Sequence, residues 1–377
     1  MSSSSIDDSD PIEIAKKLQA YAHLLPPVSP TMMGKMLSGQ PDGGDAVRGG
    51  TRGKADKPAA ARPALPGPTW PALDAAAARD RAVGCLLGLA VGDAIGTAVE
   101  FKPRDSFAPL TDMVGGGPFG LAPGEWTDDT TMALCLAESL LAKGTVDQAD
   151  LMTRFAGWLQ RGENTVSGRC FDIGATTRAA IQSFIASGNP SAGSHLATAA
   201  GNGSLVRLAP LAIFAHRDRE LAELLAGKQS HTTHATPEVI DACRLFTDVL
   251  IDALTGADKV AALRQRVMGL TPKVLFISAG EYKPKTRDQM RSSGYVVHTL
   301  EAALWSVWQT DNFHDAVLLA ANLGDDADSV AAVAGQLAGA LYGAKAIPDA
   351  WLAKLAWRDR IEKLANALFD QAAPSHP

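Results

Sequence analysis

Apolar residues recur at intervals of three and four along most of the chain after residue 73, and this spacing is typical of helices that bury one face. Alternating β-branched runs, which would indicate strands, are nearly absent. The pattern therefore predicts an all-α domain, a single large bundle of helices whose chemistry lies on the connecting loops. The ranges with helical spacing are 132–141, 151–159, 175–185, 205–214, 237–254, 260–270, 299–308, 316–321 and 330–341.

One of the predicted helices, at 80–99, differs from the others in its small residues. Glycine recurs at every fourth position from Gly84 to Gly96. Residues four apart share one helical face, so another backbone can approach this face closely. The spacing predicts a tightly packed central helix. Asp93 lies within it, and a buried carboxylate there needs a partner or a cation.

The first part of the chain has a different composition. Residues 10–25 have the apolar spacing of a short amphipathic helix, with Pro11 suited to its first turn. Residues 26–68 are rich in Pro, Gly and Ala and predict a disordered linker, because they have little apolar surface to offset the entropy of ordering. We divide the chain into an N-terminal extension, 1–72, and a helical domain, 73–372. The extension is either a tail without a task or an arm whose helix docks on a partner or on its own domain.

Composition and charge exclude several classes of protein. The 377 residues are 46% hydrophobic, enough for a sizeable core, and the net charge of −6 argues against a nucleic-acid binder that relies on phosphate contacts. No run of eighteen uninterrupted apolar residues indicates a membrane span, and the first ten residues lack the features of a secretory signal. The four scattered cysteines are typical of buried free thiols in a reducing compartment. We expect a soluble, cytoplasmic protein, and a monomer by default.

Two acidic clusters about 200 residues apart stand in the same local context. Asp128 and Asp129 lie between threonines ahead of an apolar run, and Asp326 and Asp328 precede Ser329 and a second apolar run. One such pair can simply complement the dipole at a helix start. Two clusters with hydroxyl groups beside them favour a site for hard cations such as Mg²⁺, Mn²⁺ or Ca²⁺, and the number of carboxylates is consistent with two ions.

Two further acids are candidates for proton transfer. Glu100 follows the glycine-rich helix, and Asp172 lies in a loop ahead of the helix predicted from residue 175. A carboxyl group among apolar neighbours can act as a general acid or base, because partial desolvation raises its pKa. The alternatives are an exposed acid at a helix end for Glu100 and an N-cap for Asp172.

Two polar segments suggest ligand binding more weakly. The Gly-Asn-Gly-Ser sequence at 201–204 has the composition of a phosphate-binding loop, and equally of an ordinary turn. His231 and His234 are three residues apart ahead of a proline. They are either a metal-binding pair or residues that hydrogen-bond and cap a helix start.

Taken in order, these motifs resemble the ADP-ribosylglycohydrolase family over about residues 81–343. The overall pattern is most similar to the bacterial dinitrogenase reductase-activating glycohydrolase type, which cleaves ADP-ribose from arginine. One departure is Asp325, where the family commonly has a second glycine. The segments that carry the resemblance are 88–96 with Glu100, 126–130, 170–174, 201–207, 233–234, 294–296 and 324–329.

The resemblance implies an orthogonal all-α bundle with two Mg²⁺ or Mn²⁺ ions in a cleft, and hydrolysis of N-glycosidic ADP-ribosyl-arginine on a modified protein. It implies two catalytic carboxylates, Asp172 beside the metals and the ribose and Glu100 close to the reacting sugar. The implied metal ligands are Thr127, Asp128, Asp129, Asp326, Asp328 and Ser329. The implied substrate-binding residues are Asn202, Gly203, Ser204, His234, Gly294 and Tyr295, with the 201–204 loop at the diphosphate and Tyr295 stacked on adenine.

Two other functions stay open beside this one. In the first, the protein would be an immunity protein that neutralises an ADP-ribosyltransferase toxin by binding it through the N-terminal extension, with or without hydrolysis. Alternatively, it would hydrolyse small conjugates such as O-acetyl-ADP-ribose. The motifs leave open the linked amino acid, the choice between Mg²⁺ and Mn²⁺, and which carboxylate is acid and which is base, because they describe only the ADP-ribose side of the bond.

Overall fold

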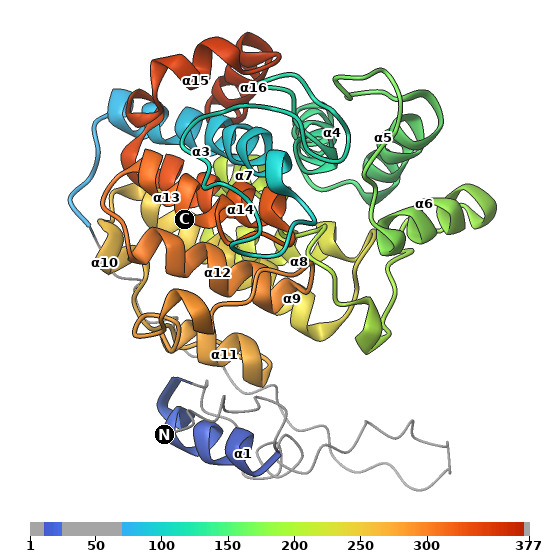
Figure 1. The fold of residues 1–377 in the computed structure, drawn as a ribbon. Coiled ribbons are helices and arrows are strands. Elements are labelled where there is room, and N and C mark those ends of the chain that lie inside the picture. Colours follow the sequence, from blue (N-terminus) through green and yellow to red (C-terminus); the bar gives the residue numbers. More distant parts are fainter. Residues whose placement is uncertain (1–10, 25–69, 373–377) are drawn as a thin grey trace, which may run out of the picture.

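The computed structural model describes residues 11–24 and 70–372, which fold mainly into helices joined by loops (Figure 1). The predicted linker at 26–68 lies outside the described residues. Within them the structure has no β-strand, only isolated bridges, so the all-α prediction is confirmed. The α-helices are α1 (Pro11–Ala20), α3 (Ala75–Gly96), α4 (Asp128–Lys143), α5 (Gln148–Arg161), α6 (Ala175–Ser187), α7 (Ala209–Ala215), α8 (Arg219–Ser230), α9 (Pro237–Thr255), α10 (Lys259–Ala262), α11 (Pro272–Ser278), α12 (Val296–Trp308), α13 (Phe313–Ala321), α14 (Ala327–Tyr342), α15 (Asp349–Lys354) and α16 (Arg358–Asp370).

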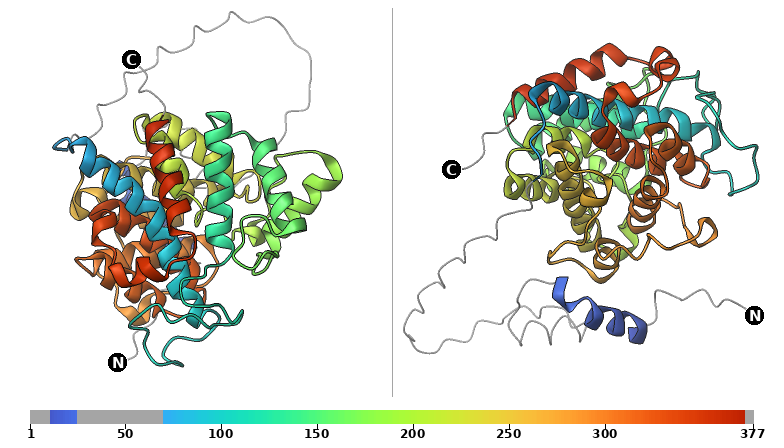
Figure 2. Two further views of the ribbon diagram at one scale, coloured as in Figure 1. Left: turned by 90° about the horizontal axis from the view of Figure 1, so that it is seen from above. Right: turned by 90° about the vertical axis from the view of Figure 1, so that its left-hand side faces the viewer.

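Helices α3 and α14 form the centre of the bundle and touch backbone to backbone. A Cβ atom placed on Gly88 would lie 2.1 Å from the carbonyl oxygen of Gly335, and one on Gly92 would lie 2.0 Å from that of Ala331. No side chain fits between the helices at these positions. Figures 1 and 2 show α3, in blue, alongside orange-red helices from the C-terminal part of the chain. The prediction of a tightly packed central helix is confirmed.

The direction of this pairing determines which chain ends meet. Gly84 lies against Gly339, whereas Gly96, twelve residues later in α3, lies against Ala327 at the start of α14. The two helices are therefore antiparallel, and the end of α3 faces the beginning of α14. Helices α12 and α13 pack on α14, and α16 packs on α3, which completes the burial of the pair.

Helix α3 and the short 3-10 helix that follows it are the one segment of the described chain that is long and apolar enough to cross a membrane. Within residues 75–99, one stretch of 18 residues reaches a mean hydropathy of 1.8, and that stretch is 100% buried inside the protein. Contact with neighbouring helices on all sides accounts for this apolar composition, because a helix at the centre of a bundle has no face toward water.

The apolar pattern at 260–270 predicts a helix, and the structure shows only a short one, α10. After Ala262 the chain leaves the helix, and Arg264 and Arg266 both pair with Asp252 of α9. Asp252 is fully buried. A buried carboxylate requires cationic partners, and supplying them from this segment is incompatible with continuing the helix.

The pattern at 205–214 also yields a shorter helix than predicted. Helix α7 begins at Ala209, with Pro210 in its first turn, where the missing N–H of proline costs no hydrogen bond. Residues 205–208 instead form turns that continue the loop at 201–204. This loop is positioned at one end of the central helices.

The N-terminal helix α1 packs on the domain at α11 (Figure 1). Lys17 Nζ lies 2.8 Å from Glu281 Oε2, and the ring centroids of Tyr21 and Phe276 are 6.2 Å apart. Past the helix, the N–H of Met268 donates to the carbonyl of Leu24. Of the alternatives for the extension, docking on its own domain is the one that residues 11–24 show.

Candidate active site

A cavity of about 260 Å³ lies where the end of α3 meets the beginnings of α4, α6 and α14. Its wall is dominated by carboxylates, and no lysine or arginine of the described chain lines it. Most of the predicted site residues are brought together here, although they come from widely separated segments. The lining residues are Glu100, Phe101, Asp128, Asp129, Asp172, 174–177, 201–203, His234, Gly294, Asp326, Asp328 and Ser329.

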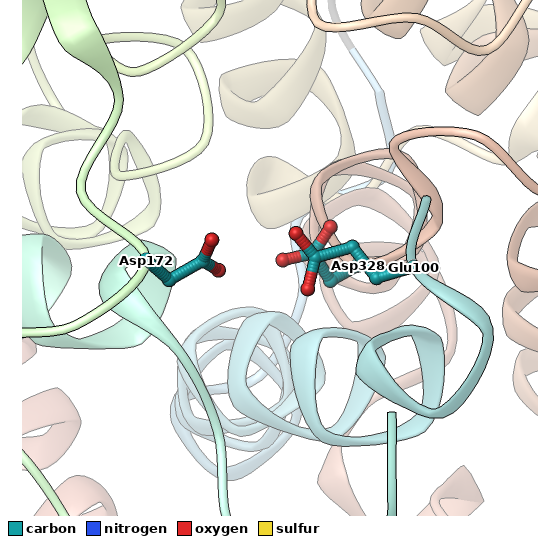
Figure 3. A group of neighbouring side chains, drawn as sticks. All are labelled: Glu100, Asp172 and Asp328. Carbon is teal, nitrogen blue, oxygen red and sulfur yellow. The ribbon is translucent and has the colours of Figure 1, made fainter. Parts of the chain in front are cut away.

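Three of these carboxylates converge from different elements. Glu100, Asp172 and Asp328 each place one oxygen so that the three atoms lie within 4.8 Å of one another. Figure 3 shows the Asp172 carboxylate pointing across a gap toward those of Glu100 and Asp328. Asp172 has a φ of +58°, a left-handed conformation in which aspartate is one of the better tolerated residues. This conformation aims its side chain into the cavity rather than toward the start of α6.

Several carboxylate oxygens in the cavity lack a hydrogen-bond donor. Within the described chain, Glu100 Oε2, Asp129 Oδ2 and Asp328 Oδ1 are buried and have no partner. Buried acceptors are normally paired, so a cluster of unpaired ones indicates that a cation or protons belong there. The donor set consists of oxygen atoms, which fits a hard divalent cation.

Burial also shifts the protonation of these acids. Desolvation, reinforced by the charges of Asp328 and Asp172, raises the pKa of Glu100 to about 12. Burial, together with neighbouring carboxylates, raises the pKa of Asp172 to about 8. The pKa values of Asp128, Asp129 and Asp328 are also raised well above the ordinary value by burial and mutual repulsion. The cluster holds protons unless a cation replaces them.

Asp93 holds the first acidic cluster in place. Its carboxylate accepts hydrogen bonds from the backbone N–H and the hydroxyl of Thr127, at 2.9 Å each, and from those of Thr130, at 3.0 and 2.6 Å. A fully buried aspartate of α3 thereby caps α4 from outside. The sequence shows that Asp93 needs a partner, but the identity of that partner depends on how α3 and α4 pack.

Thr127 lies behind the cavity wall rather than in it. It is fully buried, and besides contacting Asp93 its hydroxyl lies 3.2 Å from Asp328 Oδ2. The hydroxyl thus connects the two acidic clusters. Its role as a metal ligand stays a prediction.

The glycine-rich loop is attached to the second acidic cluster. The side-chain amide of Asn202 donates to Asp326 Oδ2 at 2.6 Å and to Thr299 at 2.9 Å, and its backbone N–H donates to Gly294. Asn202 and Gly203 line the cavity. Ser204 does not: its side chain is fully buried, and its hydroxyl lies 2.8 Å from that of Ser230. The hydroxyl predicted to bind substrate is therefore directed into the protein core in this structure.

The two histidines of the predicted pair lie in different surroundings. His234 is buried, lines the acidic cavity and has Nδ1 2.9 Å from the hydroxyl of Thr233. Burial, with Arg207 nearby, lowers its pKa to about 3, so the imidazole is neutral. A Cβ atom on Gly203 would lie 2.9 Å from the ring. His231 lines a separate surface depression.

Tyr295 adjoins the cavity without lining it. Its hydroxyl donates to Glu238 Oε2 at 2.5 Å and accepts from Lys273 at 3.2 Å, and its ring meets His298 edge-on at a centroid distance of 4.9 Å. Burial raises the pKa of the phenol. These contacts fix the ring beside the loop at 201–204, and its stacking on adenine stays a prediction.

Two parts of the cavity wall are absent from the sequence prediction. One is the first turn of α6, at 174–177, where Gly174 provides no side-chain cap and the free N–H groups remain available to a ligand. The glycine ahead of a helical pattern was the signal that could have revealed it. The other is Phe101, whose apolar side chain gives no sign of a place in an acidic site.

Asp325 departs from the resemblance in a way that the backbone explains. It has a φ of +55°, next to Gly324 at +72°. A second glycine suits this left-handed position, and aspartate tolerates it better than most residues. The turn at 324–326 therefore keeps Asp326 and Asp328 at the cavity.

Comparisons with known proteins identify the family. A model of the ADP-ribosylglycohydrolase family matches residues 74–377. ADP-ribosylarginine hydrolase Tri1 of Pseudomonas putida (strain GB-1) is 55% identical over 295 residues, 78% of this chain and 79% of that protein. ADP-ribosyl-[dinitrogen reductase] glycohydrolase of Rhodospirillum rubrum is 37% identical over 280 residues, 73% of this chain and 90% of that protein.

A solved structure of an "ADP-ribosylglycohydrolase-related protein complex" superimposes with a TM-score of 0.71 and 40% sequence identity, covering 79% of this chain and 100% of that one. This chain belongs to the ADP-ribosylglycohydrolase family.

Proposed function

We propose that this protein is a divalent-metal-dependent hydrolase that removes ADP-ribose from arginine side chains of a modified protein. The observation that carries the proposal is the cavity of buried, partly unpartnered carboxylates beside a glycine-rich loop. The 55% identity to a protein named as an ADP-ribosylarginine hydrolase supports arginine as the linked residue. We propose the cytoplasm as its place of action and a monomer as its working form.

The metal ligands in this proposal come from both acidic clusters. Asp128 and Asp129 would bind from α4, and Asp326, Asp328 and Ser329 from α14, with Thr127 between the two sides. Bound Mg²⁺ or Mn²⁺ would orient the ribose hydroxyls and lower the pKa of a water molecule. Asn202 donates a hydrogen bond to Asp326 and so links the substrate-binding loop to the proposed metal ligands.

Asp172 and Glu100 are the proposed catalytic carboxylates. Cleavage of an N-glycosidic bond develops positive charge on the ribose ring, and carboxylates beside the ring stabilise that charge. One oxygen of each lies within 4.8 Å of the other, close enough for the pair to hold one proton between them. A shared proton lets one group protonate the leaving guanidine while the other accepts a proton from water.

The opposite wall of the cavity would hold the ADP-ribose. Gly203 and the first turn of α6 offer backbone N–H groups to the diphosphate, a recognition mode that needs no lysine or arginine. The neutral imidazole of His234 adds a polar contact without charge. Glycine at 203 leaves room for both the ring and the ligand.

A release assay tests the proposal. The substrates are peptides with ADP-ribosyl-arginine or ADP-ribosyl-serine and free O-acetyl-ADP-ribose, each with Mg²⁺, Mn²⁺ or EDTA. We expect release from arginine with either cation and none with EDTA. Release from arginine in EDTA would overturn metal dependence. Preference for O-acetyl-ADP-ribose would favour the alternative function, hydrolysis of small conjugates.

The toxin-neutralising role of the N-terminal extension stays a separate prediction. Helix α1 lies outside the segment that the family model matches, and its contacts with the domain are few. Binding of an ADP-ribosyltransferase encoded beside this protein would be compared between the full chain and a chain without residues 1–70. Equal binding by both forms would exclude the extension as the binding element.

A further inference from the structure

Phe101 is an aromatic side chain placed at the mouth of the acidic cavity. It follows Glu100 directly, lines the cavity and is 63% exposed to solvent. Among the described lining residues it provides the sole phenyl ring. Other large apolar side chains are exposed too, but Phe101 lies at the cavity wall, where a bound ligand would contact it.

The backbone holds this ring outward. Phe101 has a φ of +60°, which is unfavourable for a residue with a large side chain. Its N–H donates to the carbonyl of Asp325 at 2.7 Å, and the N–H of Asp325 donates back to the carbonyl of Lys102 at 2.8 Å. This pair of hydrogen bonds ties the loop after α3 to the turn before α14. The backbone of Phe101 is thus fixed in relation to the carboxylates on both sides.

The charge of the cavity indicates what the ring would contact. Carboxylates line the wall, and no lysine or arginine of the described chain offsets them. No basic side chain among the described residues of this wall would repel a planar cation, and the face of an aromatic ring attracts one. Phe101 is adjacent in sequence to Glu100, the proposed catalytic carboxylate, and both residues line the cavity.

We propose that Phe101 is a specificity-determining residue whose ring stacks on the guanidinium group of the ADP-ribosylated arginine. The inference rests on the proposed function and adds the contact that recognises the far side of the bond. Recognition of the ADP-ribose itself does not involve this ring.

The test compares Phe101→Ala, Phe101→Leu and Phe101→Trp with the wild-type protein. Loss of a cation–π contact is expected to raise KM for an ADP-ribosyl-arginine peptide roughly 3- to 30-fold with kcat nearly unchanged. Leucine should behave as alanine, because it keeps apolar bulk without a π face, and tryptophan should retain the wild-type KM. Inhibition by ADP-ribose, which lacks arginine, should stay the same in all variants.

Val260→Ala is the matched control, since Val260 on α10 is 62% exposed and does not line the cavity. Melting temperatures of all variants confirm that folding is retained. An equal weakening of ADP-ribose inhibition in Phe101→Ala, or an unchanged KM, would overturn the inference alone. Failure of the wild-type protein to cleave the arginine conjugate would overturn the proposed function and the inference with it.

Discussion

Asp93 of α3 and Asp129 of α4 are both buried at the start of α4, but they differ in whether their oxygens accept hydrogen bonds. Asp93 accepts four hydrogen bonds from two threonines. Asp129 has a buried oxygen without any donor and faces other carboxylates. The first residue therefore contributes to stability, whereas the second destabilises the protein unless a cation binds.

Substitution by asparagine separates these two roles. Asp129→Asn should abolish turnover and keep or raise the melting temperature in EDTA, because it removes repulsion from the cluster. Asp93→Asn should lower stability by roughly 2 kcal/mol or more, since an amide NH₂ would face two donors of Thr130. Thermal melts with and without Mn²⁺, beside a turnover assay, measure both effects. Full activity of Asp129→Asn would contradict its role as a ligand.

The metal-free protein should lose stability as pH rises. The pKa of Asp172 is raised from its ordinary 3.8 to about 8. The folded state therefore binds more protons than the unfolded chain between these values, and its advantage, complete below about pH 4, is lost as pH rises through 8. Melting temperatures in EDTA should fall from about pH 5 to about pH 8, and more gently in Asp172→Asn.

The same shift predicts the effect of added metal. Because cations displace protons from the cluster, Mg²⁺ or Mn²⁺ should raise the melting temperature more at about pH 8 than at about pH 5. If melting temperature depended on pH in the same way in the wild-type protein and Asp172→Asn, with and without metal, Asp172 would not titrate as the structure indicates.

Some residues of the candidate site could be predicted from the sequence, and others could not. The acidic clusters stand out because carboxylates and hydroxyls repeat in one context ahead of two helices. Phe101 does not, because a left-handed backbone at phenylalanine is set by hydrogen bonds to a turn more than 200 residues away. Ser204 fits the phosphate-loop composition, yet its hydroxyl turns toward Ser230, a contact that only the packed helices create.

Among the helices, the seam between α3 and α14 is the most sensitive to added volume. Gly92→Ala would place a methyl group 2.0 Å from the carbonyl of Ala331, and backbone cannot yield as a side chain can. We expect a loss of about 1–3 kcal/mol or more in the free energy of unfolding, together with weaker metal binding as the helix ends shift. Urea unfolding and metal titration measure the two effects.

Gly227→Ala in α8 is the matched control. Its new methyl group would meet only a side-chain carbon of Ile240 at 3.5 Å, an ordinary contact. Because alanine favours helices over glycine, this variant should be stabilised by up to about 1 kcal/mol. If both glycine variants behaved alike, close backbone contact at the seam would not be the cause.

Apolar spacing predicted most of the longer helices, but it missed α8, α11, α15 and α16, and it placed two helix ends wrongly. Spacing alone extends a helix through 260–270, whereas Arg264 and Arg266 leave it to pair with Asp252. Burial of an acid on α9 thus decides the end of α10. Such a constraint acts between elements, and a single-segment pattern does not contain it.

On the scale of the whole molecule, the all-α bundle was predictable and the relative placement of its elements was not. Periodicity shows that helices exist and which faces are apolar. It does not show that α3 and α14 run antiparallel, although this places Asp93 and Asp328 at one end of the bundle. The resemblance to a family supplied that convergence of motifs, and the packing supplies its physical cause.

The docked N-terminal helix leads to a prediction about the complete chain. Helix α1 contacts α11, whose residues do not line the acidic cavity. A chain without residues 1–69 should therefore keep kcat/KM on ADP-ribosyl-arginine. It should melt at a slightly lower temperature, because the domain surface that buries Leu24 becomes exposed to solvent. A large fall in kcat/KM would show that the extension takes part in catalysis.

The even spacing of small residues along α3 and α14 has a consequence for refolding. Since the repeat is four residues on both helices, a slip by one repeat, about 6 Å, would again set small residues against each other. Such a slip would carry Asp328 out of reach of Thr127. Refolded protein should therefore contain a fraction of inactive molecules beside molecules with the normal kcat. It should show full helix content but fewer metal sites per chain.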